Sequence, residues 1–180
     1  MKKKQTTISS LDEMVDIVDI QNIVLHSTTK KQAHTEGLLH RTVIAELKDS
    51  QGNWVFVKQA ADRQDAGQLV SPVGGHVQAG ETELEALYRE AFEEIGLKDF
   101  EHKFVGRAIF NREILGRKEN HYFVLYEIFS DEIPQLNHES VSHVSFTEKD
   151  FKKRLSSHPH EFGHAFHFIL DTFYEHLRKA

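Results

Sequence analysis

The chain has 180 residues, of which 39% are hydrophobic and 28% charged, enough to form one domain with its own hydrophobic core. The absence of cysteine excludes disulfides, thiolate metal sites and a cysteine nucleophile. The formal net charge of −6 argues against a nucleic acid as the main partner, because a phosphate backbone favours a basic face. A small phosphate-bearing molecule stays compatible with this charge if metal cations mediate its binding.

Nothing in the sequence predicts a membrane partner or a secretory signal. No run of 18 apolar residues indicates a membrane span. The basic N-terminus is followed at once by Asp12, Glu13 and Asp16 rather than by an apolar segment. We therefore expect a cytoplasmic protein that forms a single domain over residues 1–180, with residues 1–10 as a flexible end.

Strand and helix patterns alternate along the chain. Turn signals such as residues 50–53 separate neighbouring strands and indicate hairpins. Interspersed strands and helices predict an α/β fold with a mixed sheet and helices on both faces. The expected strands are residues 14–19, 22–27, 41–49, 54–60, 72–77, 100–114, 119–130 and 141–147, and the expected helices are residues 82–96, 148–156 and 161–178.

The first expected helix has clear signals at both ends. Thr82 followed by Glu85 is a capping-box pattern, and Gly96 is a typical C-terminal stop. Its apolar residues fall on one stripe, which predicts the face that packs on the core. They are Leu84, Leu87, Tyr88, Ala91 and Ile95.

Glutamates crowd along the same helix. At 3.6 residues per turn, Glu90, Glu93 and Glu94 fall within an arc of about 100° that begins at the edge of the apolar stripe. Three carboxylates there form an oxygen-rich site suited to Mg²⁺ or Mn²⁺. Arg89 lies one turn from Glu93 and can hold a carboxylate in place, and Glu81 is a further partner for it. The alternative is an ordinary solvated face of the helix.

The order and spacing of these residues resemble the Nudix box, the signature of Nudix hydrolases. The resemblance covers residues 75–97 and implies a catalytic loop–helix–loop in an α/β/α sandwich. It also implies divalent-metal-dependent hydrolysis of a diphosphate linkage, in a nucleoside diphosphate derivative or a related organic diphosphate. The matching positions are Gly75, Glu81, Arg89, Glu90, Glu93, Glu94, Ile95, Gly96 and Leu97, with Ala91 standing where an aliphatic residue is expected.

The resemblance implies roles for the residues that match by position. It leaves open which glutamate is the general base. The implied roles are Glu90 and Glu94 as principal ligands of Mg²⁺ or Mn²⁺, Glu93 as a further ligand or the base, Gly75 as a residue that frees the backbone near the metal, and Arg89 and Glu81 as orienting residues.

A second resemblance links residues 33–43, 73–81 and 119–122 to isopentenyl-diphosphate isomerases, which share the Nudix fold. Those enzymes use a His-rich metal site together with a catalytic cysteine and a glutamate. The residues that match that site by position suggest a second metal or phosphate site, although they could equally be structural. They are His34, His40, His76 and Glu119, with His121 where a second glutamate would stand.

Gly74 decides between the two resemblances. The isomerase cysteine would fall at Gly74, whereas the hydrolytic glutamates are all present. We therefore expect an isomerase-like Nudix hydrolase, a pyrophosphohydrolase that acts on a small-molecule diphosphate and could form a homodimer. The alternatives are an isomerase and a non-catalytic ligand-binding module. The identity of the diphosphate is not predicted.

Overall fold

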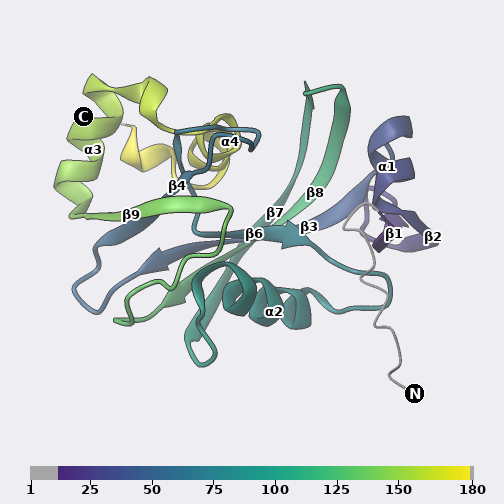
Figure 1. Cartoon of the computed structure of the whole chain (residues 1–180), viewed down its shortest axis with the longest axis horizontal. Helices are drawn as coiled ribbons and strands as arrows, with labels where there is room; N and C mark the ends of the chain where they lie inside the picture. The colour runs from purple at the N-terminus through teal and green to yellow at the C-terminus, as the bar shows by residue number, and fades with distance from the viewer. Residues whose placement is uncertain (1–11, 179–180) are drawn as a thin grey trace, which may run out of the picture.

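A computed structural model describes residues 12–178, so the expectation for residues 1–10 falls outside the described residues. These residues form a mixed, nine-stranded sheet with helices on both faces (Figure 1), as the sequence predicts. The strands are β1 (Met14–Val18), β2 (Val24–Thr29), β3 (His40–Lys48), β4 (Trp54–Gln59), β5 (Leu69–Val70), β6 (Val73–His76), β7 (Glu101–Ile114), β8 (Arg117–Phe129) and β9 (Ser140–Phe146). The helices are α1 (Lys30–Glu36), α2 (Glu83–Ile95), α3 (Glu148–Ser157) and α4 (His164–Phe173), with single 3₁₀ turns at Pro159–Glu161 and Glu175–Leu177.

Strand β3 organises the sheet. Along one edge it pairs with β8 in parallel over its whole length, from His40 opposite His121 to Lys48 opposite Phe129. Along its other edge it pairs antiparallel with β1, β6 and β4 in turn. Residues that are more than 70 positions apart in the sequence, on β3 and β8, are thereby fixed side by side.

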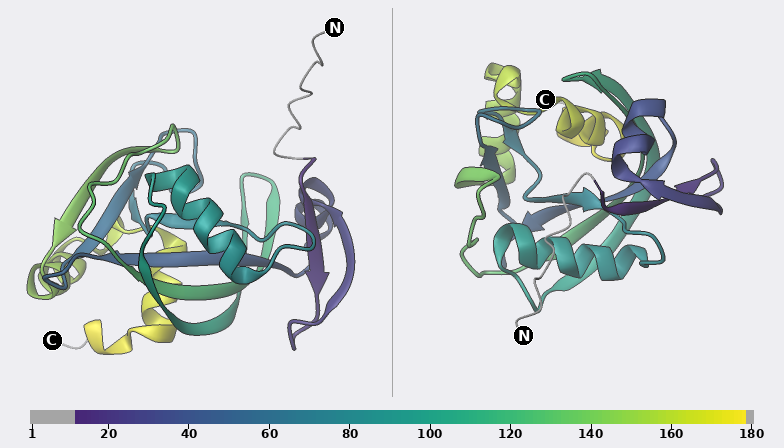
Figure 2. Two further views of the ribbon diagram at one scale, coloured as in Figure 1. Left: turned by 90° about the horizontal axis from the view of Figure 1, so that it is seen from below. Right: turned by 45° about the vertical axis from the view of Figure 1, so that its right-hand side comes forward.

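Helix α2 covers one face of the sheet (Figure 2). Side chains alternate between faces along a strand, so every second residue of β3 points toward α2. The cluster between them is fully apolar and includes Val43, Ala45 and Leu47 from β3, Val124 and Ile128 from β8, and Ala86, Leu87, Ala91 and Ile95 from α2.

Helices α3 and α4 cover the opposite face. Aromatic side chains dominate this second cluster, in which Phe56 packs edge-on against Phe162 and Phe166. Large aromatic rings bury much apolar surface each, so this layer contributes a large share of the hydrophobic stabilisation. The main members are Ile44, Trp54, Phe56, Phe110, Phe123, Leu125, Phe151, Phe162, Phe166 and Ile169.

Helix α1 and strands β1 and β2 form one end of the molecule, where α1 lies beside the β1–β2 hairpin (Figure 1). Val15, Ile17 and Ala33 form a small core of their own there. Among residues 12–178, no helix is long and apolar enough to cross a membrane.

The structure corrects the predicted core face of α2. Leu84 is 41% exposed and Tyr88 is 37% exposed, whereas Ala86 is buried. The buried stripe is rotated toward Ala86 and Leu87 because the sheet lies on that side. The Tyr88 ring instead stacks on Phe100 near the helix edge.

Two short elements go beyond the sequence analysis. Helix α1 and strand β5 lie in stretches for which no element is expected, and β5 falls between the expected strands 54–60 and 72–77. The last predicted helix is shorter, with α4 spanning His164–Phe173 between two 3₁₀ turns.

Candidate active site

Strand β6 and helix α2 are in contact through the backbone of the strand and the carboxylates of the helix. The Gly74 amide donates to Glu94 Oε2 over 2.7 Å. At Gly75 a Cβ atom would lie 2.0 Å from the Glu90 carboxyl group, so only glycine allows this approach. The helix itself begins and ends as the sequence predicts, with a complete Thr82–Glu85 capping box and Gly96 in the left-handed conformation.

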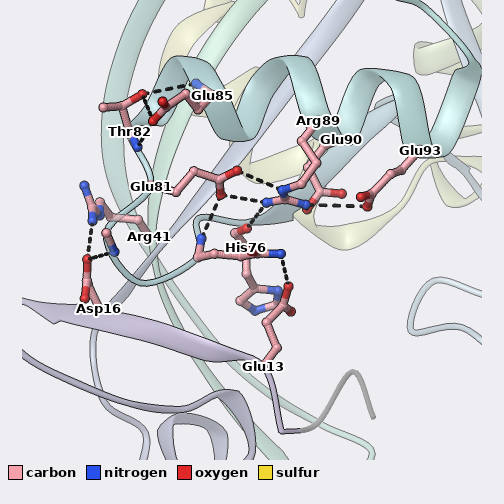
Figure 3. Close-up of polar contacts among 12 residues, drawn as sticks. Glu13, Asp16, Arg41, His76, Glu81, Thr82, Glu85, Arg89, Glu90 and Glu93 are labelled. Atoms are coloured by element: carbon pink, nitrogen blue, oxygen red, sulfur yellow. Dashed lines mark hydrogen bonds and ion pairs between the residues drawn. The ribbon is translucent and has the colours of Figure 1, made fainter. Parts of the chain in front are cut away.

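Arg89 ties the loop to the helix (Figure 3). Its Nε and Nη2 atoms donate to the two oxygens of Glu81, each over 2.8 Å. Nη2 also donates to the His76 carbonyl over 2.9 Å, and Nη1 donates to Glu90 over 2.6 Å. Burial alone would lower the pKa of Arg89, but Glu81 and Glu90 outweigh it and raise that pKa. The guanidinium therefore fixes the positions of two carboxylates and one strand end.

The three box glutamates differ in how firmly they are held. Glu90 is 12% exposed and Glu93 is 54% exposed. Glu93 has a contact of 3.5 Å with Arg89, which is the limit of a hydrogen bond. Glu93 is therefore the carboxylate most open to solvent.

The electrostatics of these carboxylates suit a cation. Burial raises the pKa of Glu90 to about 7, in spite of Arg89 beside it. Burial and the neighbouring Glu90 raise the pKa of Glu94 well above its ordinary value. Carboxylates crowded in this way favour a bound proton or a divalent cation, and a cation displaces the protons when it binds. The donors are carboxylate oxygens, and a donor set of this kind fits a hard divalent cation.

A cavity of about 410 Å³ opens in front of the box glutamates. Its lining includes carboxylates, among them Glu13 and Glu139, for which the sequence predicts no role. It also includes apolar side chains, among them Phe110, Phe123 and Ile169. The cavity therefore offers both charged and apolar surface.

Four histidines converge beside this cavity, of which His76 and His121 line it. One nitrogen from each ring lies within 4.8 Å of the others in the group formed by His34 on α1, His40 on β3, His76 on β6 and His121 on β8. His40 is directly opposite His121 in the β3–β8 ladder. His76 is opposite Thr42, two residues along β3 and thus on the same face as His40.

The hydrogen bonds of His34 and His40 define which of their ring nitrogens carries the proton. His34 Nδ1 lies 3.2 Å from the Lys118 carbonyl, and His40 Nδ1 lies 2.7 Å from the Leu38 carbonyl. A carbonyl only accepts, so both Nδ1 atoms carry the proton and both Nε2 atoms present a lone pair. Burial lowers the pKa of His34 and of His40 to about 4, so these rings are neutral at pH 7.

Glu119 lies outside the histidine group. Its carboxylate accepts from Arg112 Nε over 2.5 Å, and Arg112 also pairs with Asp65 over 3.0 Å. Both partners of Arg112 are buried. His121, which stands where the isomerase resemblance would have a second glutamate, is the residue that joins His34, His40 and His76 in the group. The role expected of Glu119 stays a prediction.

The chain matches the NUDIX domain family over residues 38–166. It is 35% identical over 103 residues to an uncharacterized Nudix hydrolase of Yersinia pestis, a match covering 56% of each chain. It is 34% identical over 87 residues to an isopentenyl-diphosphate Delta-isomerase of Serratia proteamaculans, covering 48% of this chain and 49% of that enzyme. Each match thus spans about half the length of these relatives.

Solved structures share the fold. The crystal structure of DR0079 from Deinococcus radiodurans superposes with a TM-score of 0.71 at 22% identity, over 90% of this chain and 99% of that one. This likeness concerns the arrangement of the elements described above, and the box residues 75–97 lie within the matched family segment.

Proposed function

This chain belongs to the NUDIX domain family, and from that premise we propose that it is a divalent-metal-dependent pyrophosphohydrolase acting on a small-molecule diphosphate. The observation that carries the proposal is the meeting of Glu90 and Glu94 with the glycines of β6, at the mouth of a cavity. We propose Mg²⁺ or Mn²⁺ as the cofactor, because the donors are oxygens.

Bound at these carboxylates, a divalent cation would neutralise the diphosphate and lower the pKa of a water molecule. Glu90 and Glu94 would hold the cation, and Arg89 with Glu81 would hold Glu90 and the end of β6 in position. Glu93 is the carboxylate with the weakest pairing and the greatest exposure. It is therefore placed to accept the proton of the attacking water or to serve as a further ligand. The attack breaks a P–O bond of the diphosphate, and the leaving phosphate carries away the bonding electron pair.

The test is a panel of nucleotide sugars, dinucleotides, nucleoside triphosphates and prenyl diphosphates, assayed for released phosphate with phosphatase or pyrophosphatase coupling. With Mg²⁺ or Mn²⁺ we expect turnover of at least one substrate, which EDTA abolishes. Glu94→Gln should lower this turnover by at least about 100-fold, because the negative charge of the carboxylate that would hold the cation is lost. Glu101→Gln, at an exposed glutamate of β7, is the matched control and should retain full activity. The absence of metal-dependent turnover across the panel would refute the proposal.

One relative favours a second candidate, isomerase activity on isopentenyl diphosphate. The histidine group agrees with it, but Gly74 stands where the cysteine is required and the chain has no cysteine. Deuterium uptake from D₂O into an allylic product would support the isomerase. Tight diphosphate binding with neither hydrolysis nor exchange would instead support a ligand-binding module.

The other expectations remain part of the proposal. They are a cytoplasmic location, one domain over residues 1–180 and a homodimer. Size-exclusion chromatography with light scattering would test the dimer directly.

A further inference from the structure

A buried cluster of three charged side chains lies in the wall of the cavity. Arg112 on β7 donates through Nε to Glu119 on β8 over 2.5 Å, and through Nη1 to Asp65 over 3.0 Å. Asp65 comes from the loop between β4 and β5. The three side chains are only 4–10% exposed, and all three residues line the cavity. One guanidinium and two carboxylates give this group, the Arg112 cluster, an excess of negative charge.

Each member of the Arg112 cluster keeps one polar atom free. Arg112 Nη2, Asp65 Oδ2 and Glu119 Oε1 form no hydrogen bond within residues 12–178, and none of them is sealed from solvent. Polar groups that are nearly buried are normally paired, because an unpaired one costs free energy. The cluster thus presents one N–H donor group and two carboxylate acceptors to an occupant of the cavity.

The wall beside the cluster adds aromatic surface and a further unpaired group. The Arg112 guanidinium lies 5.5 Å from the centre of the Phe110 ring, which stacks on Phe123 at 4.9 Å. Thr42 lies opposite Phe123 in the β3–β8 ladder and also lines the cavity. Its hydroxyl oxygen is buried and has no hydrogen-bond partner in the described part of the chain. A ligand that fills this space therefore needs hydrogen-bonding groups as well as apolar surface.

The Arg112 cluster lies well away from the box glutamates along the strands. Glu119 precedes Phe123 by four residues on β8, and Phe123 is level with Thr42. At about 3.3 Å per residue, the cluster is about 13 Å along the sheet from Thr42. Gly75, which contacts Glu90, pairs with β3 one residue from Thr42. A substrate whose diphosphate lies at the box glutamates thus reaches the cluster only with the organic group attached to it.

The chemistry of the cluster narrows what that organic group carries. A further phosphate would be repelled by Asp65 and Glu119. An ammonium group has no acceptor for Arg112, and an apolar chain would leave all three polar groups without a partner. A hydroxyl both donates and accepts. Hydroxyls on neighbouring carbon atoms therefore satisfy the two carboxylates and the guanidinium together.

We propose that Asp65, Arg112 and Glu119 bind the hydroxyl groups of a sugar or similar polyol attached to the diphosphate, and so determine which organic group is accepted. This inference rests on the proposed function, because it places the diphosphate at the box glutamates. Asp65 and Glu119 accept hydrogen bonds from hydroxyl groups. Arg112 holds both carboxylates in position and donates from Nη2 to a hydroxyl oxygen. None of the three takes part in breaking the P–O bond.

Ribose 5-diphosphate and isopentenyl diphosphate are suitable probes, because both are diphosphate monoesters of five-carbon groups and only the first carries hydroxyls. Calorimetric titration of the full-length protein, with Ca²⁺ in place of Mg²⁺, would measure both Kd values as a binding readout separate from turnover. We expect ribose 5-diphosphate to bind at least about 10-fold more tightly, since hydrogen bonds to charged groups have effects of that size. Equal affinities, tighter binding of isopentenyl diphosphate, or no binding of ribose 5-diphosphate would overturn the proposal.

Variants distinguish hydroxyl binding from a purely structural ion pair. Asp65→Asn and Glu119→Gln should each weaken binding of ribose 5-diphosphate by about 10-fold and leave that of isopentenyl diphosphate unchanged. Loss of a structural pair would instead alter both affinities together. Glu161→Gln, at the surface pair with Arg154, is the matched control and should keep both wild-type values. If both cluster variants fold and keep the wild-type ratio of affinities, the assignment is wrong.

Turnover measurements separate this inference from the proposed function. Metal-dependent hydrolysis without any preference for hydroxyl-bearing substrates would support the hydrolase and refute the role of the Arg112 cluster. A hydroxyl preference in binding, lost in Asp65→Asn, without hydrolysis of any diphosphate would support the cluster and refute the hydrolase.

Discussion

The carboxylate of Glu90 occupies the space that a side chain at position 75 would need. A Cβ atom on Gly75 would lie 2.0 Å from it, closer than any real contact of that kind. At the adjacent Gly74, by contrast, no described heavy atom lies within 4 Å of a Cβ atom. Two neighbouring glycines therefore have different reasons to be glycine, and substitution at each should have a different result.

Gly75→Ala should lower metal-dependent turnover by about 100-fold, because displacing a ligand by an ångström has effects of that size. The measurement is kcat and the Mg²⁺ concentration for half-maximal rate. Gly74→Ala is the matched control, and its turnover should stay within a few-fold of wild type. Equal effects at the two positions would contradict this account of Gly75.

Arg89→Lys should lower kcat by about 10–100-fold and raise the Mg²⁺ requirement, because lysine cannot hold both oxygens of Glu81 and still reach Glu90. Steady-state rates over a range of Mg²⁺ concentrations would measure both effects. Arg154→Lys offers a control at a similar two-bond pair, with Glu161 on the surface. That variant should behave as wild type, and an Arg89→Lys variant with unchanged Mg²⁺ dependence would rule out the positioning role.

Glu46→Gln should make folding stability less dependent on pH. Burial raises the pKa of Glu46 from 4.5 to about 7, so the folded chain binds this proton more tightly than the unfolded chain does. Its contribution is therefore present in full below pH 4.5 and is lost as the pH rises toward 7. At about 1.4 kcal/mol per pKa unit, the loss is on the order of 3 kcal/mol.

Urea unfolding at pH 5 and pH 8 would test this difference. The variant keeps an oxygen for the hydrogen bond from Ser71, which is 2.6 Å long in the wild-type chain. It should be more stable than wild type at pH 8 and close to it at pH 5. The exposed Glu101→Gln should follow wild type at both pH values, and parallel curves for all three proteins would exclude a buried, protonated Glu46.

Asp16→Asn should destabilise the fold at neutral pH and have little effect in acid. Burial would raise the pKa of Asp16, but hydrogen bonds from Gly80 and Ser27 and the pairing with Arg41 outweigh it and lower the pKa below 3.8. A depressed pKa stabilises the fold above pH 3.8, and that contribution disappears as the pH falls through the folded value.

The expected loss at pH 7 is about 3 kcal/mol, the usual cost of breaking a buried ion pair from one side. Urea unfolding at pH 7 and at pH 3 or below would show the gap between the two proteins closing. A gap of the same size at both pH values would mean that the Asp16 charge does not contribute.

Local signals predicted the parts of this molecule that depend on neighbouring residues. The capping box at Thr82, the stop at Gly96 and the turn at residues 50–53 all involve groups within a few positions, so they can be read directly. The box spacing likewise placed Glu90 and Glu94 beside β6, because helix geometry fixes their directions.

Local sequence signals could not predict how strands distant in the sequence pair with one another. His121 joins the other histidines only because β8 pairs in parallel with β3, an arrangement between segments about 80 residues apart. Glu119 pairs with Arg112, which lies opposite it in the β7–β8 ladder, and this pairing also depends on how two strands align. Helix α1 has only seven residues, too few to be stable without tertiary contacts, so periodicity could not identify it.

The histidine group also depends on how the sheet is aligned. A shift of one residue between β3 and β8 would turn His121 to the opposite face while leaving His40 in place. The same shift between β3 and β6 would remove His76. The four rings therefore converge only when three strands are in their native register, so the assembled cluster distinguishes the correctly folded chain from its slipped competitors.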